Sequence, residues 1–256
     1  MSAALGAVLD KFTTNLAIRN IIGQSESSFD FRKVMDEGKI LIVNLSKGLI
    51  GDENMSFLGL LIVQKLLAAA LSRENIPEEE RKDFFFYADE FQNFATEEFN
   101  SILSEARKYR LNLTLAHQYI GQLPEDIKNA VFGNVGSLFI TRCSPEDAQF
   151  LETPFEGYVT ASDIVNQSMG HWYTKLLNNG SYPSPFSLVS SYGPKFPDSG
   201  FDLPVNKEVT GIIKEMSRRK YGRDVNVVAN DIRTRAQLDR KEEQAQNPAP
   251  GFPPIF

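Results

Sequence analysis

Two adjacent carboxylates, Asp89 and Glu90, follow a run of large apolar residues and are the clearest candidates for chemistry in this 256-residue chain. The run Phe84–Ala88 is too short for a stable helix and is typical of a strand buried on both faces of a parallel sheet. Ligands bind at the carboxyl ends of such strands. One carboxylate there can hold a hydrated Mg²⁺, and its neighbour can orient or deprotonate a water. The pattern predicts half of a nucleotide-hydrolysis site, although acidic residues at strand ends are also commonplace.

Strands and helices alternate around this pair at the spacing of βαβ units. We expect helices over residues 29–37, 53–73, 96–109 and 124–132, and one opened by an N-cap at Ser144. We expect buried strands over 39–45, 84–88, 111–116 and 137–141. A hairpin is predicted over 172–190, around the turn Asn178-Asn179-Gly180. The fold class is therefore α/β, with a mostly parallel sheet flanked by helices, a terminal hairpin and a helical tail.

The domain organisation follows from composition. Residues 1–192 form the α/β core, and the Pro/Gly-rich stretch 193–205 is a linker. Residues 206–243 are predicted to be a helical tail and the Pro-rich end, 244–256, to be disordered. The tail carries a basic cluster that is either a solvated helix face, the favoured interpretation, or a contact to DNA phosphates; its members are Lys214, Arg218, Arg219, Lys220 and Arg223.

The bulk composition excludes several classes of protein. The net charge of −6 and the pI near 5.1 exclude a surface that is basic throughout, so a nucleic acid must be met by a local patch, pore or loop. Cys143 is the only cysteine, which excludes an intrachain disulfide framework and fits a reducing, cytoplasmic setting. The start of the chain has no basic n-region of a signal peptide. The longest apolar stretch, residues 57–71, is interrupted by Gln64 and Lys65 and is predicted not to span a membrane.

Several strings taken together resemble one family over residues 15–190. They are Gly38–Gly48, Tyr87–Phe94, Leu103–Tyr109, Leu115–Tyr119, Asn134–Gly136 and Pro145–Ala148. In this combination the chain resembles the motor core of conjugative DNA-transfer ATPases. These are the coupling proteins of type IV secretion systems (the TraG/TraD group), which have more distant relatives among the FtsK and HerA translocases. The resemblance implies a RecA-like P-loop NTPase core, of which this chain carries the C-terminal part.

The resemblance also implies roles for four residues. Asp89 would be the Walker B carboxylate associated with Mg²⁺, and Glu90 the general base. Gln118 would be the polar sensor of the γ-phosphate, although a Gln after a strand can also be a turn residue. Arg107 would be an arginine finger for the nucleotide of a neighbouring subunit, or simply a cation favourable to the helix dipole. His117 receives no role, and Arg142 is a weaker second candidate for a trans-acting arginine.

The implied cofactors are ATP and Mg²⁺, and the implied partners are further copies in a hexameric ring, DNA, and components of the secretion system and relaxosome. No Gly-x-x-x-x-Gly-Lys-Ser/Thr phosphate loop occurs in the sequence, and in the family that loop lies far upstream of Lys39–Leu45. Alone, the chain is expected to bind ATP poorly and hydrolyse it negligibly.

The leading hypothesis is a segment of an ATP-driven DNA translocase. It would lie in the cytoplasm, or at the cytoplasmic face of the inner membrane through an upstream anchor. The alternative is a non-catalytic assembly module that docks on a complete ATPase or on a secretion substrate. A metal-dependent nuclease is disfavoured, because further acidic or His ligands at convergent strand ends are lacking.

Overall fold

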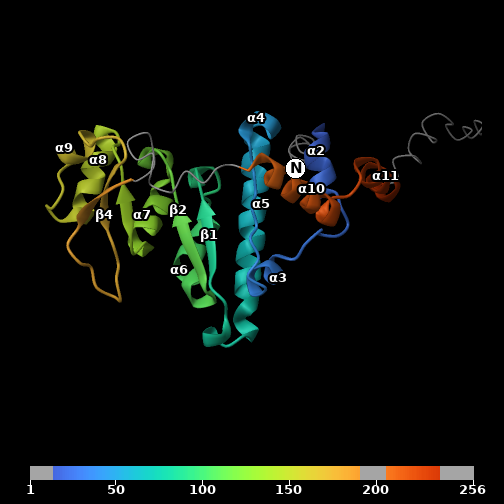
Figure 1. Cartoon of the computed structure of the whole chain (residues 1–256), viewed down its shortest axis with the longest axis horizontal. Helices are drawn as coiled ribbons and strands as arrows, with labels where there is room; N and C mark the ends of the chain where they lie inside the picture. Colours follow the sequence, from blue (N-terminus) through green and yellow to red (C-terminus); the bar gives the residue numbers. More distant parts are fainter. Residues whose placement is uncertain (1–13, 191–205, 237–256) are drawn as a thin grey trace, which may run out of the picture. The chain divides into compact units, whose positions relative to one another are not determined.

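The computed structural model describes residues 14–190 and 206–236, and the chain divides into two compact units (Figure 1). The larger unit comprises Phe31–Asn44 and Ser56–Val205; the smaller comprises Met1–Asp30, Leu45–Met55 and Asn206–Phe256. The predicted linker and the Pro-rich end lie outside the described residues.

The larger unit contains a parallel pair of strands, β1 (Phe84–Ala88) and β2 (Leu111–Leu115). The parallel pairing confirms the prediction, but the predicted burial of β1 on both faces is wrong. Phe84, Phe86 and Ala88 point towards the core, whereas the Phe85 and Tyr87 side chains are 60% and 70% exposed. Successive side chains of a strand point to opposite faces, and in the described part of the chain only one face of this strand is covered.

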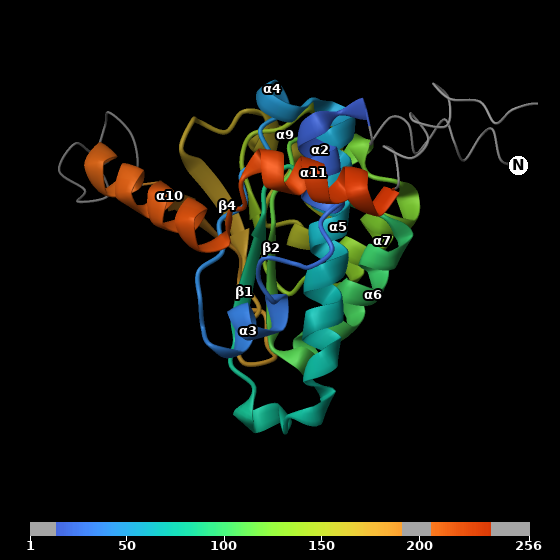
Figure 2. The ribbon, with the colours of Figure 1, turned by 90° about the vertical axis from the view of Figure 1, so that its right-hand side faces the viewer.

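Three helices cover that face: α5 (Asp52–Leu71), α6 (Glu97–Glu105) and α7 (Glu125–Asn134) (Figure 2). Their apolar side chains form one core with the two strands. Its buried members include Val63, Leu66, Ala70, Phe99, Ile102, Leu111, Ile127 and Val131. All three helices lie close to their predicted bounds. Thr96 is the N-cap residue of α6 as predicted, but its side chain makes no capping hydrogen bond.

By length and composition alone, one helical stretch in the described residues, Asp52–Asn75, could cross a membrane. It comprises α5 and the 3-10 turn that follows it. Because Val63, Leu66 and Ala70 of α5 are buried in the core of the larger unit, we interpret the stretch as the core helix of a globular domain.

The predicted strand over Lys39–Leu45 is not formed. The short helix α3 (Phe31–Asp36) ends as predicted at Gly38, which has a φ of +68°, but the following stretch pairs with no strand among the described residues. Ile40 and Ile42 are 91% and 86% exposed. Apolar β-branched residues favour a strand only where a neighbouring strand offers hydrogen-bond partners and burial. In the part of the chain that the structure describes, β1 pairs with β2 and with no further strand.

The second sheet of the larger unit is antiparallel, in the order β3–β4–β5. Its strands are β3 (Leu138–Ile140), β4 (His171–Lys175) and β5 (Phe186–Val189). The hairpin β4–β5 confirms the prediction, with Asn179 and Gly180 at positive φ in its turn. The expectation of one mostly parallel sheet is therefore only partly met, since β3 pairs with β4 and not with β2 in the described chain.

A separate apolar cluster supports this sheet. It involves α8 (Pro145–Glu152) and α9 (Ala161–Val165), and its buried side chains are Ile120, Ile140, Ala148, Leu151, Phe155, Val159 and Ile164. Ser144 caps α8 as predicted: its hydroxyl oxygen accepts the Asp147 N–H at 3.2 Å. Within residues 14–190, short 3-10 turns lie between these elements, at Ser72–Asn75, Glu78–Glu80, Phe91–Asn93, Ala106–Tyr109, Ile120–Gln122 and Thr153–Phe155.

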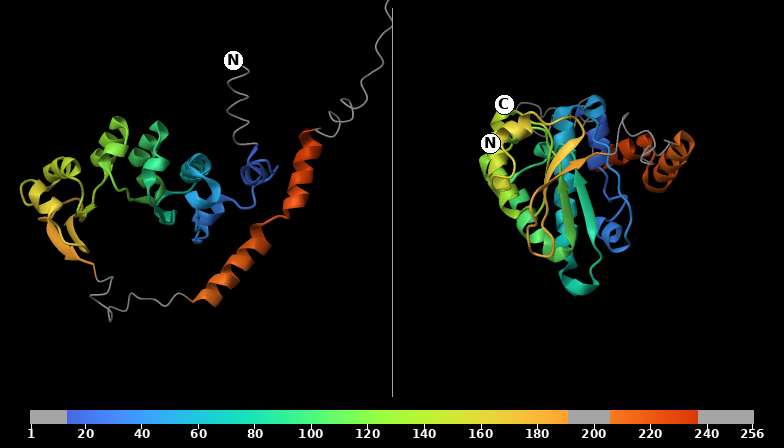
Figure 3. Two further views of the ribbon diagram at one scale, coloured as in Figure 1. Left: turned by 90° about the horizontal axis from the view of Figure 1, so that it is seen from above. Right: turned by 60° about the vertical axis from the view of Figure 1, so that its left-hand side comes forward.

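The smaller unit is helical in its described part. Its helices are α2 (Leu16–Ile22), α4 (Lys47–Ile50), α10 (Lys207–Tyr221) and α11 (Val225–Ala236), the last two forming the predicted tail (Figure 3). Helix α11 packs against α2, where the Ile232 side chain lies on Gly23 and the Arg235 guanidinium donates to the Gly23 carbonyl.

Candidate active site at the carboxyl ends of β1 and β2

The two parallel strands end at the same level, which brings the candidate residues together. Ala88 is paired with Leu115 in the register. The Ala116 N–H donates to the Ala88 carbonyl at 2.9 Å, and the Phe91 N–H donates to the Ala116 carbonyl at 3.1 Å. The segments that carry Asp89-Glu90 and His117-Gln118 are thus held side by side, as expected for the carboxyl ends of a parallel pair.

Glu90 and Gln118 are in direct contact. The Gln118 Nε2 donates to Glu90 Oε1 at 2.5 Å, and the Gln92 Nε2 donates to Glu90 Oε2 at 2.6 Å. Both oxygens of the carboxylate therefore accept a side-chain amide. Gln92 has no place in the sequence-based prediction, although its position two residues after Glu90 puts it within reach of the same turn.

The backbone of Glu90 is in the left-handed region, with φ of 50° and ψ of 43°. Few residues other than glycine adopt this conformation. The following 3-10 turn stabilises it, because the N–H and the Nδ2 of Asn93 both donate to the Glu90 carbonyl, at 3.1 and 2.9 Å. An outlier that its surroundings hold in place is a pointer to function, and here it directs the glutamate side chain towards Gln118.

Asp89 fits the ligand that a hydrated Mg²⁺ requires. Its side chain is exposed, and Oδ1 accepts the Glu90 N–H at 3.0 Å. The described residues contain no group of three or more His, Cys, Asp or Glu side chains that could form a metal cage. Magnesium in nucleotide sites is typically held by one or two carboxylates together with waters and phosphates, and a single exposed carboxylate is compatible with such a site.

His117 lies inside the site, which the sequence did not indicate. Its ring meets the Phe91 ring edge-on, with centroids 5.2 Å apart. Burial lowers the pKa of His117, and the charges of Asp147 and Glu90 only partly counter that effect. Burial thus favours the neutral form of the imidazole. Asp147 is itself buried, and its Oδ2 accepts the Ile120 N–H at 3.2 Å.

Arg107 is not close to this site within the chain. It is exposed and lies in the 3-10 turn before β2, at the end of the strand opposite to Gln118. The two positions thus lie beyond opposite ends of β2, whose five residues span roughly 17 Å at the usual rise of a strand. Arg142, the weaker candidate, is exposed after β3.

A buried arginine fixes the turn that carries Arg107. Arg73 is fully buried; its Nε donates to Asp36 Oδ1 and its Nη1 donates to the Tyr109 carbonyl, both at 2.9 Å. Arg32 also donates to Asp36. A buried guanidinium needs such partners, and here they connect α3, the end of α5 and the start of β2.

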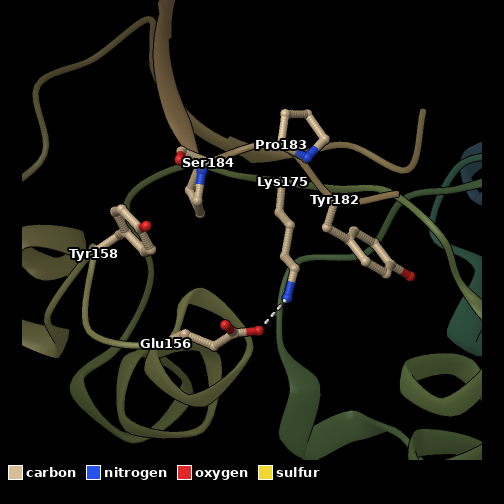
Figure 4. A pocket seen from close by; sticks show the side chains of 7 residues that line it. Glu156, Tyr158, Lys175, Tyr182, Pro183 and Ser184 are labelled. Atoms are coloured by element: carbon tan, nitrogen blue, oxygen red, sulfur yellow. Dashed lines mark hydrogen bonds and ion pairs between the residues drawn. The ribbon is translucent and has the colours of Figure 1, made fainter. Parts of the chain in front are cut away.

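A shallow pocket lies in a different part of the larger unit (Figure 4). It is lined by Glu156, Tyr158, Lys175, Tyr182, Pro183, Ser184 and Pro185. The Lys175 ammonium donates to the Pro154 carbonyl at 2.7 Å and to Glu156 Oε1 at 3.0 Å, and it lies 4.9 Å from the centre of the Tyr182 ring. These contacts make Lys175 a structural brace of the hairpin.

Comparison with known proteins gives one family and one set of structures. The sequence profile of the family described as "Type IV secretory system Conjugative DNA transfer" matches residues 3–134, just over half of the chain. A search of curated proteins produced no match.

Among the solved structures that resemble this chain are several of the bacterial conjugative coupling protein TrwB. The trigonal form of TrwBdeltaN70 in complex with sulphate is 16% identical, with a TM-score of 0.50 over 66% of this chain and 46% of that chain. The unbound monoclinic form and the complex with ADP and Mg²⁺ are each 17% identical over 54% of this chain, with TM-scores of 0.45 and 0.43. The chain spans 38% to 46% of the length of these structures. At such identities the likeness concerns the mixed α/β fold alone.

Proposed function

Because this chain belongs to the family of type IV secretory system conjugative DNA transfer proteins, we propose that it supplies the Walker B and sensor side of an ATP-hydrolysis site. The motor would be a ring-forming translocase that feeds DNA to a secretion channel. The observation that supports this proposal most directly is the hydrogen bond from Gln118 to Glu90 across the ends of two neighbouring parallel strands. A phosphate sensor and a general base have to act on the same water and phosphate, so they must be neighbours.

In this proposal each side chain of the site has a separate role in phosphoryl transfer to water. Glu90 takes the proton of the attacking water, and the amides of Gln118 and Gln92 hold its carboxylate in position. Gln118 turns one amide donor to the γ-phosphate when nucleotide is present. Asp89 holds the hydrated Mg²⁺, which when bound neutralises charge on the phosphates.

Arg107 acts on a different subunit in this proposal. It is exposed and lies beyond the end of β2 opposite to Gln118, and β2 itself spans roughly 17 Å, so we expect its own site to be out of reach. In a ring of copies, a guanidinium on the surface can reach the nucleotide of the neighbour and stabilise the charge of the transferred phosphoryl group. The ring, the DNA and the secretion components are the partners that we propose.

The phosphate-binding side of the site must come from elsewhere, since this sequence holds no Gly-x-x-x-x-Gly-Lys-Ser/Thr loop. Among the described residues β1 and β2 pair only with each other. Each strand therefore keeps one edge where a further strand can add. A phosphate-loop segment that pairs with this sheet would complete the site, in the cytoplasm or at the inner membrane. TrwB was solved with ADP and Mg²⁺, and we propose ATP and Mg²⁺ as the cofactors here.

The test is DNA-stimulated ATP hydrolysis by a complete motor that contains this chain and a phosphate-loop segment. We expect Glu90→Gln to reduce kcat by roughly 10²- to 10⁴-fold, the usual contribution of a general base. Glu156→Gln is the matched control, because Glu156 is an exposed carboxylate in the hairpin region of the same unit. Full activity in the Glu90→Gln motor would exclude Glu90 as the base.

Calorimetric titration with ATP and Mg²⁺ distinguishes the proposal from a non-catalytic assembly module. We expect the complete motor to bind nucleotide and this chain alone to bind it at least tenfold more weakly, because the amides and lysine of a phosphate loop are absent from it. If the complete protein also fails to bind, the chain is an assembly module and not part of an ATPase site.

A further inference from the structure

Helix α10 presents an apolar stripe that nothing in the described part of its unit covers. None of its 15 residues is buried. The stripe consists of Val209, Ile212, Ile213 and Met216, which are 47%, 52%, 60% and 66% exposed. Their spacing of three, one and three residues puts them on one face of the helix. A sustained apolar face of this kind normally lies against another surface.

The described contacts of the smaller unit leave the stripe free. Helix α10 is held at its C-terminal end, where the Tyr221 ring meets the Phe29 ring with centroids 6.1 Å apart. Helix α11 packs on α2 through Ile232 and Arg235. The described contacts thus hold the end of α10, while the side chains of the stripe are exposed.

The tail also carries the charge that an anionic surface requires. Residues 206–236 contain eight Lys or Arg and four Asp or Glu, a net charge of +4 in a chain whose total is −6. Three of these cations, Arg218, Arg219 and Lys220, directly follow the stripe. Glu215 accepts from Arg218 at 3.2 Å and from Arg219 at 2.8 Å. It is the one acidic partner of the cluster that the structure describes.

We propose that α10 lies on the surface of an anionic lipid bilayer, with its stripe at the headgroup–acyl boundary and Arg218, Arg219 and Lys220 on the headgroup phosphates. An amphipathic helix with a strongly polar face, modest overall hydrophobicity and flanking Lys and Arg has the properties of an interfacial helix. Each cation near such a surface adds to the affinity. The proposal does not depend on the ATPase assignment.

Two other occupants fit the observations less well. A second copy of α10 could cover the stripe, but four side chains that are only 47% to 66% exposed offer much less area than the roughly 800 Å² that one partner buries in a standard interface. A DNA duplex would attract the basic cluster through its phosphates. It offers no apolar surface for Ile212, Ile213 and Met216, however, and these residues would stay in water.

Flotation of the whole chain with vesicles tests the proposal. We expect binding to vesicles of phosphatidylcholine and phosphatidylglycerol and roughly tenfold weaker binding to phosphatidylcholine alone. The double substitution Ile212→Asp with Ile213→Asp should reduce binding by roughly tenfold or more. Val225→Asp with Val227→Asp is the matched control, since these valines of α11 are 58% and 56% exposed, and it should keep binding. Circular dichroism verifies that both variants keep their helices.

Three results would overturn the proposal. The first is equal binding to neutral and anionic vesicles, and the second is an equal loss in the α11 variant. The third is failure of the chain to float with anionic vesicles. In that case size-exclusion chromatography and binding of duplex DNA, each with the Ile212 and Ile213 substitutions as control, identify the other occupant. A dimer that these substitutions abolish would assign the stripe to a second copy, and DNA binding that they abolish would assign the tail to nucleic acid.

Discussion

Gly59 of α5 lies against the loop that carries Glu90, so a single methyl group there should disturb both packing and the site. A Cβ at Gly59 would meet the Phe94 ring at 2.2 Å, at both Cδ1 and Cε1. Real Cβ atoms essentially never approach a neighbour below 3.0 Å. Phe94 belongs to the turn after Glu90, where its N–H donates to the Phe91 carbonyl at 2.9 Å, and its ring packs against the apolar core, so either the ring or the turn must shift.

The effect of Gly59→Ala on the free energy of unfolding has two opposing parts. Replacing glycine by alanine inside a helix gains about 1 kcal/mol from helix propensity. Forcing an extra methyl group into a packed core costs about 1–3 kcal/mol. Gly133 in α7 provides the matched control, since nothing lies within 4 Å of its Cβ position and Gly133→Ala should therefore show the gain alone. We expect Gly59→Ala to be less stable than Gly133→Ala by about 1–3 kcal/mol, the overpacking part.

Urea denaturation of the two variants and the wild-type chain measures this difference in the free energy of unfolding. In the complete motor, Gly59→Ala should also lower ATP hydrolysis, because a displaced turn carries Glu90 away from Gln118. Equal stabilisation by both alanines would refute the reasoning, since it would mean that Phe94 does not rest on Gly59.

Two further predictions concern capping and acid stability. Burial raises the pKa of Asp36, but the hydrogen bonds and charges of Arg32 and Arg73 outweigh it and leave the pKa below its ordinary value. The stability that this carboxylate contributes is thus present above its unfolded pKa and is lost as the pH falls through the lowered one. Asp36→Asn should lower the free energy of unfolding by about 1–3 kcal/mol at pH 7 and make it depend less on pH in the acid range. If the free energy of unfolding falls with pH equally in variant and wild type, the prediction is wrong. Ser144→Ala should lower the free energy of unfolding by about 1 kcal/mol, because the Ser144 hydroxyl caps α8. Thr96→Ala should be nearly neutral, because the Thr96 side chain makes no capping hydrogen bond. Similar losses of stability for the two variants in thermal unfolding would contradict this difference.

Local sequence signals account well for the elements and for the meeting of the site residues. The cap at Ser144 and the turn at Asn179 and Gly180 depend only on neighbours in the sequence. That Glu90 and Gln118 converge follows from one further fact, the parallel pairing of two successive strands. The family resemblance had implied that Glu90 and Gln118 share one site, and the strand pattern is consistent with it.

Features that depend on residues far apart in the chain could not be predicted from local sequence signals. Lys39–Leu45 has the composition of a buried strand, yet Ile40 is 91% exposed, because burial is decided by whether another strand lies beside it. The same holds for Tyr87, whose apolar neighbours suggested burial on both faces. The contacts of His117 with Phe91 and its proximity to Asp147 join residues that are far apart in the chain, and no spacing rule connects them.

The packing of the apolar core fixes the register of β1 and β2, and this register in turn sets the positions of the candidate site residues. Sliding β1 by one residue would turn Phe84 and Phe86 away from the core, and sliding it by two would keep the faces but shift Glu90 along the sheet by about 6.6 Å. Either slip would carry its carboxylate out of reach of Gln118. The apolar side chains of the core thus determine whether Glu90 and Gln118 are in contact. Changes in the size of these side chains should therefore alter catalysis as well as folding.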